Sequence, residues 1–190
     1  PLVALAVSPE DKIAILNALY TETYLRDIVG RNKIRKVAEL ENLLDILAST
    51  IGSLVNPEKL RKTFHSVKNS KINASTLTKY IAYLEDAYLL EAAQRYDIKS
   101  KAYIETPQKY YYSDLGLRNA RLNFRQLEET HSMENIIYNE LRHRKFNVDI
   151  GQVTVNEKNT AGTYSRKQLE VDFVANKGSK RYYIQSAYMI

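Results

Sequence analysis

Two acidic side chains and one amide near the C-terminus have the types and order that metal-dependent phosphodiester cleavage requires. Glu134 lies in a segment with helical periodicity, Asp172 lies in a predicted strand, and Gln185 lies in the strand that follows a Lys-Gly-Ser turn. Oxygen ligands at such positions can converge on Mg²⁺, which activates water and stabilises charge developing on the phosphate. Ala187 would share a face with Gln185, where a lysine could orient the water. The sequence therefore predicts a weak metal site at Glu134 and Asp172 with no complete catalytic set.

A simpler interpretation of the same stretch is an ordinary hairpin. Val171, Phe173 and Ile184 are typical core residues of strands, and Asp172 would then be an exposed or turn-facing acid. A third alternative is that a cation from elsewhere replaces the missing lysine. The candidates for that cation are Lys177, Lys180 and Arg181.

Helices are predicted to occupy most of the first half of the chain. Ser8-Pro9 is a typical helix start, because serine caps and proline suits the first turn, and this helix is expected to stop at Gly30. Apolar spacing predicts further helices over about 37–51, 57–67, 75–88 and 132–144. Asn56 and Asn73 precede two of them.

Strands are predicted over about 92–98, 109–113, 146–155, 168–176 and 180–189. A polar connection containing Pro107 should join the first two, and 113–120 should form a short helix or turn. The fold class is therefore α+β.

The order of a capped helix, a short turn, a second capped helix and a strand pair predicts a winged helix-turn-helix. Side chains of a recognition helix read bases, while surrounding cations hold phosphates. The predicted nucleic-acid-binding residues are Lys59, Arg61, Lys62, Lys71, Thr76, Thr78, Lys79, Tyr83, Arg95, Lys99 and Lys101. Winged helices also dock proteins, and Glu85 and Asp86 place acid on the second helix, so both roles stay open.

Composition narrows the setting without deciding the function. The 190 residues include 28 Lys and Arg against 22 Asp and Glu, a net charge of +6 that is compatible with DNA. There is no cysteine, which excludes disulfides and thiolate metal sites. No apolar run is long enough to cross a bilayer, so we predict a cytoplasmic protein with no membrane partner.

Several blocks of the sequence together resemble a known family. These are ETYLRDIVGRN, LTKYIAYLEDAYLL, KYYYSDLGLRNA, MENIIYNELRHRKFNVDIG and LEVDFVANKGSKRYYIQSA. They resemble the region, usually labelled a domain of unknown function, that follows the ATPase domain in predicted bacterial and archaeal AAA-type ATPases. The resemblance implies a winged helix followed by a restriction-endonuclease-like domain of the PD-(D/E)xK type. The family's helix acid falls on Glu134, its strand acid on Asp172, its second-strand acid or Gln on Gln185 and its Lys on Ala187, which departs from the catalytic pattern.

The resemblance also implies a division of the chain. Residues 1–35 would be a helical segment from the end of the ATPase lid, 36–120 the winged helix-turn-helix, and 130–190 a C-terminally incomplete nuclease-like domain. The phosphate-cradling loop of an ATPase is absent from the chain, so ATP would bind only through the ATPase domain. Mg²⁺ is the cofactor left as a possibility, and DNA and the chain's own ATPase domain are the expected partners.

Three hypotheses for the function remain. The first is a nucleic-acid-binding module with an inactive nuclease-like domain, which makes this fragment no enzyme. The second is an interaction or regulatory module that couples the ATPase to a partner. The third is an active Mg²⁺-dependent DNA nuclease, against which Ala187 counts. In the nuclease-like arrangement, Glu134, Asp172 and Gln185 should converge in space.

Overall fold

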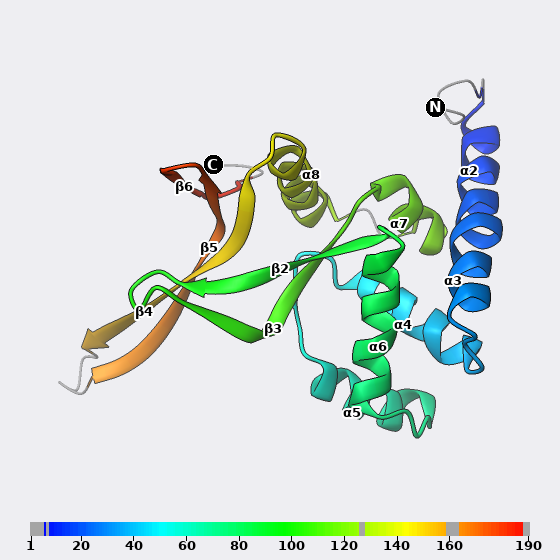
Figure 1. Ribbon diagram of the computed structural model, residues 1–190, viewed down its shortest axis with the longest axis horizontal. Helices are drawn as coiled ribbons and strands as arrows, with labels where there is room; N and C mark the ends of the chain where they lie inside the picture. The colour runs from blue at the N-terminus through cyan, green and yellow to red at the C-terminus, as the bar shows by residue number, and fades with distance from the viewer. Residues whose placement is uncertain (1–5, 7, 126–127, 159–163, 188–190) are drawn as a thin grey trace.

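The protein has an α+β fold built around one six-stranded mixed sheet (Figure 1). The computed structural model describes residues 6, 8–125, 128–158 and 164–187. In chain order the elements are α2 (Pro9–Ala18), the π-helical η1 (Leu19–Leu25), α3 (Arg26–Arg31), α4 (Val37–Ser49), β1 (Leu54–Val55), α5 (Pro57–Lys68), α6 (Ala74–Asp86), β2 (Leu90–Asp97), β3 (Ala102–Tyr112), α7 (Leu115–Arg121), α8 (Glu129–His143), β4 (Asn147–Lys158), β5 (Tyr164–Lys177) and β6 (Lys180–Ile184). Within the described residues, no helix combines the length and apolarity that crossing a bilayer requires.

Local capping explains why the helices begin where they do. The Ser8 side chain accepts a hydrogen bond from the Asp11 amide at 3.0 Å, as predicted. Asn56 and Asn73 cap α5 and α6 in the same way, each accepting a backbone N–H at 2.8 Å. These bonds satisfy amides that have no partner within the helix. The first helical run passes through Gly30 and ends one residue beyond the predicted stop.

The sheet joins strands from both halves of the chain in the order β1-β3-β2-β4-β5-β6. All neighbouring pairs are antiparallel except β2 and β4, which run parallel through Arg95–Asp97 and Ile150–Gln152. The β2–β3 hairpin is therefore part of the same sheet as the C-terminal strands, and the sheet crosses the predicted domain boundary.

Two buried clusters hold these elements together. The larger one lies among the helices of the first half, where α4 contributes Leu40, Leu43, Leu44 and Leu47, all at most 2% exposed. The smaller one lies between α8 and the centre of the sheet, and its aromatic members are Tyr111, Tyr138 and Phe173. The second cluster fixes α8 over the strands that carry the candidate site.

Two strand boundaries differ clearly from the prediction. β3 begins at Ala102, so most of the predicted polar connection is strand. Pro107 is tolerated there because the β2–β3 register shifts, with Ala93 opposite Lys109 but Arg95 opposite Ile104. Pro107 has no assigned ladder partner in β2 or in β1, so no ladder bond requires the missing N–H.

The last strand was expected to continue to Met189, but β6 ends at Ile184. The amide of Ser186 donates to the Asp172 carboxylate instead of to a backbone carbonyl, which ends the ladder. Residues 188 and 189 of that prediction lie outside the described residues. The two-residue strand β1 was not predicted, and α8 starts at Glu129 rather than Ser132.

Candidate functional site

Glu134 is buried where α8 crosses the sheet. Glu134 is 5% exposed. Its Oε1 atom accepts a hydrogen bond from the Lys109 ammonium at 3.0 Å and another from the Tyr111 hydroxyl. Burial and the adjacent Glu134 charge raise the pKa of Tyr111, so this hydroxyl stays protonated and donates.

Asn135 holds α8 in the orientation that aims Glu134 at the sheet. Its side-chain carbonyl accepts from the Tyr112 amide at 2.8 Å, and its side-chain amide donates to the Tyr112 carbonyl at 2.8 Å. The two bonds pair the side chain with the end of β3 as a neighbouring strand would. Because Glu134 precedes Asn135 directly, its position is fixed against Lys109 and Tyr111 of the same strand.

Lys109 is the centre of the cluster. It is 4% exposed, and its ammonium donates to Glu134 at 3.0 Å and to Glu170 of β5 at 2.6 Å. Burial lowers the pKa of Lys109, but the charges and hydrogen bonds of the two carboxylates outweigh burial and shift the pKa upward. The lysine is therefore charged and joins three elements: β3, α8 and β5.

Asp172 has different partners. It is 7% exposed, so the interpretation of this residue as an exposed acid was wrong. Its Oδ2 atom accepts both from the Ser186 amide and from the Ser186 hydroxyl, each at 2.6 Å. Strand alternation puts Asp172 on the same face of β5 as Glu170. The structure thus links Glu134 to β5 through Lys109 and Glu170, and links Asp172 to the segment after β6.

The remaining residues of the predicted site lie at the surface. Ile184 is the last residue of β6 and pairs with Phe173. Gln185 and Ala187 follow it outside any strand, and both are exposed. Gln185 is therefore in the neighbourhood of Asp172 along the chain, but it is not held in the sheet as expected.

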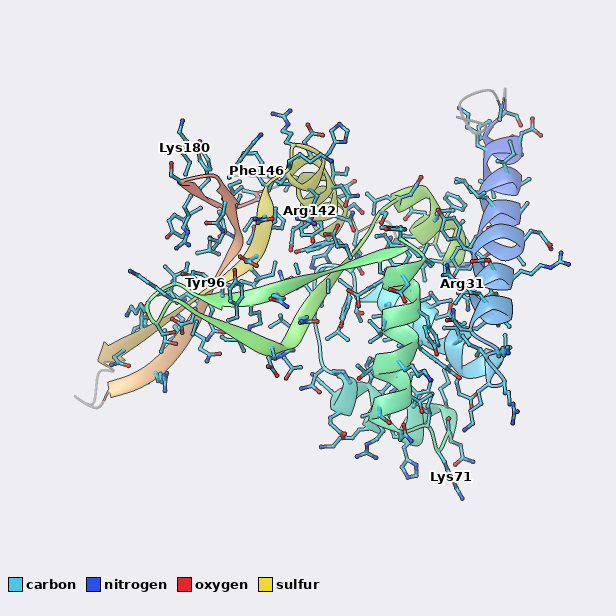
Figure 2. All side chains as sticks on the ribbon, viewed as in Figure 1. Arg31, Lys71, Tyr96, Arg142, Phe146 and Lys180 are labelled. Atoms are coloured by element: carbon cyan, nitrogen blue, oxygen red, sulfur yellow. The ribbon has the colours of Figure 1, made fainter. Side chains whose placement is uncertain are left out.

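The cations proposed to replace the missing lysine point elsewhere. Lys177 donates to the Arg144 carbonyl at 2.9 Å, and Arg181 donates to Asn176 and Tyr96. Lys180 lies at the outer end of β6 (Figure 2). The lysine that contacts the predicted acid is Lys109, which the sequence interpretation missed along with Glu170, Tyr111 and Ser186. Alternation in KYYYS and LEVDF indicates that Lys109 shares a face with Tyr111 and Glu170 with Asp172, but not that the two strands meet.

The arrangement does not fit a bound Mg²⁺. Mg²⁺ needs several oxygen ligands at about 2.0–2.1 Å in octahedral geometry. Glu134 and Glu170 share one ammonium, and Asp172 is engaged by Ser186. Among the described residues, no group of three or more acidic or histidine side chains is disposed to hold a metal ion. Lys109 would have to move before a cation could use these two glutamates.

The predicted nucleic-acid-binding residues fall into two groups on the surface. The first group lies on α5, α6 and the turn between them. Its exposed members are Lys59, Lys62, Lys71, Thr78 and Lys79, and its half-buried members are Arg61, Thr76 and Tyr83. Arg61 pairs with Glu58, and the Lys79 ammonium lies over the Tyr83 ring. Figure 2 shows Lys71 at this end of the molecule and Tyr96 of β2 far across the view.

The second group lies at the far end of the β2–β3 hairpin. Arg95 donates to Gln152, and Lys99 donates to the Thr154 carbonyl at 2.6 Å, so both cations contact β4. Lys101 is exposed at the hairpin end. The hairpin is directed away from α5 and along β4 (Figure 1). The two groups therefore lie in different parts of the structure.

The fold and the cluster define an α+β protein with a buried carboxylate–lysine centre. The chain belongs to the family described as a domain of unknown function, DUF8612, which matches residues 1–128. An uncharacterized protein of Haemophilus influenzae is 32% identical over 190 residues, which is 100% of this chain and 44% of that protein. An uncharacterized protein of Methanocaldococcus jannaschii is 28% identical over 174 residues, or 92% of this chain and 36% of that protein. The chain thus spans less than half of these relatives, and no solved structure matches it.

Proposed function

We propose that this chain is a nucleic-acid-binding module in which a winged helix-turn-helix contacts the ligand and a nuclease-like C-terminal part is catalytically inactive. The observation that carries the proposal is the order α4, β1, α5, α6, β2, β3, with β1 and β2 pairing on either side of β3. That order and pairing are those expected of a winged helix-turn-helix. The exposed lysines of α5 and α6 lie on the helices of this winged helix-turn-helix.

Charge distribution along α6 supports the N-terminal part of this helix as the contact region. Thr76, Thr78 and Lys79 lie in its first half, whereas Glu85 and Asp86 lie at its end. The first turn contains no acidic residue. A phosphate group would therefore be attracted by the N-terminus of α6 and by the exposed ammonium groups near it. The acidic residues at the C-terminal end of α6 would repel the phosphate.

In the longer protein, the module follows an AAA-type ATPase part, and ATP binds there. The support for this context is the resemblance of the sequence blocks. The cytoplasmic location likewise stays a prediction.

A second candidate function is protein docking by the C-terminal part. An apolar groove of about 550 Å³ lies between α8 and β6, and its lining includes Ile136, Phe146 and Tyr183. Ile136 is 57% exposed and Tyr183 is 54% exposed. Exposed apolar side chains that gather in one groove are typical of contact surfaces.

Removing three lysines of the α5–α6 surface should weaken binding to all DNA sequences. The variant carries Lys62→Ala, Lys71→Ala and Lys79→Ala. Each lost phosphate contact should flatten the slope of log K against log salt by roughly 0.9 for duplex DNA. Fluorescence anisotropy with labelled duplex and single-stranded oligonucleotides at several salt concentrations measures both the affinity and the slope.

A variant with the same loss of charge elsewhere is the control. Lys12, Lys167 and Lys180 are exposed on α2, β5 and β6, away from α5 and α6, and are replaced by alanine together. The control should keep the wild-type salt slope. If both variants lose affinity and salt slope equally, net charge alone explains the effect. If the α5–α6 variant binds DNA as tightly as wild type, the result favours the protein-docking function.

The chain should not cleave DNA in the presence of Mg²⁺ or Mn²⁺. Lys109 already neutralises Glu134 and Glu170, and Ala187 supplies no group beside the strand acid. Loss of one group that stabilises transition-state charge costs on the order of 10²–10³ in rate. Supercoiled plasmid is incubated with metal and protein, beside an Asp172→Ala variant. Nicking by the parent protein that vanishes in this variant would make the nuclease hypothesis the leading one.

A further inference from the structure

Glu134, one of the two predicted metal ligands, already pairs with a cation that belongs to the chain. The Lys109 ammonium lies 3.0 Å from Glu134 and 2.6 Å from Glu170, and the Lys109 and Glu134 side chains are only 5% and 7% exposed. Two carboxylates that face each other across a buried space repel unless positive charge lies between them. In metal-dependent sites a divalent cation supplies this charge. Here an ammonium supplies it.

We propose that the Lys109 ammonium takes the place of a divalent cation between Glu134 and Glu170, and that it makes this site independent of metal. The inference concerns the cluster of Lys109, Glu134 and Glu170 and does not rest on nucleic-acid binding. Its consequence is that a neutral side chain at position 109 opens a divalent-cation site formed by the two glutamates. Asp172, on the same face of β5 as Glu170, is the nearest further carboxylate along that strand.

The surroundings of the cluster favour exclusion of metal in the wild-type chain. A depression of about 160 Å³ reaches Glu170 from the surface and is also lined by Arg95 and Gln152. Glu170 has a side chain that is 39% exposed, so ions have access to it. A divalent cation that enters there meets the positive charge of Arg95, and the Lys109 ammonium contacts both Glu170 and Glu134.

The same contacts would arise from an ion pair that only joins β3, α8 and β5. In that case, loss of Lys109 would destabilise the fold without creating affinity for metal. Metal affinity after the substitution therefore separates the two explanations. Tyr111 donates to Glu134 in either case and is left unchanged.

The test compares Mn²⁺ binding by the wild-type chain and the Lys109→Met variant, measured by calorimetry and by the electron paramagnetic resonance signal of free Mn²⁺. Methionine keeps most of the length of the lysine stem and removes its charge. The variant should bind one Mn²⁺ at least about tenfold more tightly than wild type, and Glu134→Gln added to it should remove most of that gain, as expected for loss of a ligand or its close partner. Lys12→Met, at an exposed lysine of α2, should bind Mn²⁺ as wild type does.

Thermal unfolding supplies a second measurement if Lys109→Met folds poorly. Added Mn²⁺ should raise the melting temperature of this variant and restore its circular dichroism, with no comparable effect on wild type. Absence of any gain in metal affinity or melting temperature in Lys109→Met overturns the proposal. So does binding of Mn²⁺ by the wild-type chain that Glu134→Gln abolishes, and this measurement needs no change at Lys109.

Discussion

Replacing Phe173 with alanine is expected to lower the free energy of unfolding by about 3–5 kcal/mol, the usual cost of deleting a buried aromatic side chain. Phe173 is fully buried, and its ring centroid lies 6.0 Å from that of Tyr111 and 6.2 Å from that of Tyr138. These rings form the core between α8 and the sheet. Since whole domains are stable by about 5–15 kcal/mol, the variant should be close to unfolding at physiological temperature.

Urea unfolding followed by circular dichroism measures this effect, and the same strand offers a control. Leu169 lies four residues earlier on β5 and is 42% exposed. Leu169→Ala should cost less than about 1 kcal/mol, as substitutions away from the core usually do. A similar loss of unfolding free energy in both variants would contradict the conclusion that Phe173, and not Leu169, belongs to the buried core.

The protein should lose stability steeply as the pH rises above about 10. Burial raises the pKa of Tyr20, Tyr111, Tyr112 and Tyr138 well above that of a free tyrosine, and it raises the pKa of Tyr110 to about 12. The unfolded chain then releases these protons near pH 10, about the ordinary tyrosine pKa, while the folded chain retains them. Each such group lowers the free energy of unfolding by up to about 1.4 kcal/mol per pH unit in the interval between its two pKa values.

The raised pKa of Lys109 acts in the same direction. The folded chain holds this proton at a pH where the unfolded chain has lost it, so the stability contributed by the ammonium is present at neutral pH. It disappears as the pH rises from about 10.4, the pKa of a free lysine, through the folded value. Alkaline unfolding should therefore be cooperative and should coincide with the appearance of tyrosinate absorbance.

Single tyrosine substitutions check the origin of this alkaline loss. The Tyr20 hydroxyl is buried without a hydrogen-bond partner among the described residues. Tyr20→Phe should therefore keep its stability near neutral pH and make the alkaline slope shallower by up to about 1.4 kcal/mol per pH unit. Tyr88 is 82% exposed, and Tyr88→Phe should leave the slope unchanged. Equal slopes in wild type and Tyr20→Phe would show that buried Tyr20 does not drive the transition.

The sequence alone determined the features that depend on neighbours in the chain. Capping residues and apolar spacing located α5 and α6 to within a few residues, because a helix is formed by contacts between residues three or four apart. The same local rules identified the α+β class and the strand around Asp172. They also marked Glu134 and Asp172 as acids worth attention, because these types at helix and strand positions suit a cation.

Tertiary structure alone decided which groups meet. Lys109 is 25 residues from Glu134 and 61 from Glu170 in the chain, and no periodicity indicates that the Lys109 side chain on β3 reaches both Glu134 on α8 and Glu170 on β5. The parallel pairing of β2 with β4 brings Arg95 and Lys99 into contact with β4, whereas the sequence predicted both cations on an exposed wing. Strand partners are chosen by burial and backbone pairing over the whole sheet, and these are properties of the assembled fold rather than of any one segment. For that reason Glu134 could be predicted, but Glu170 and the lysine that joins the two glutamates could not.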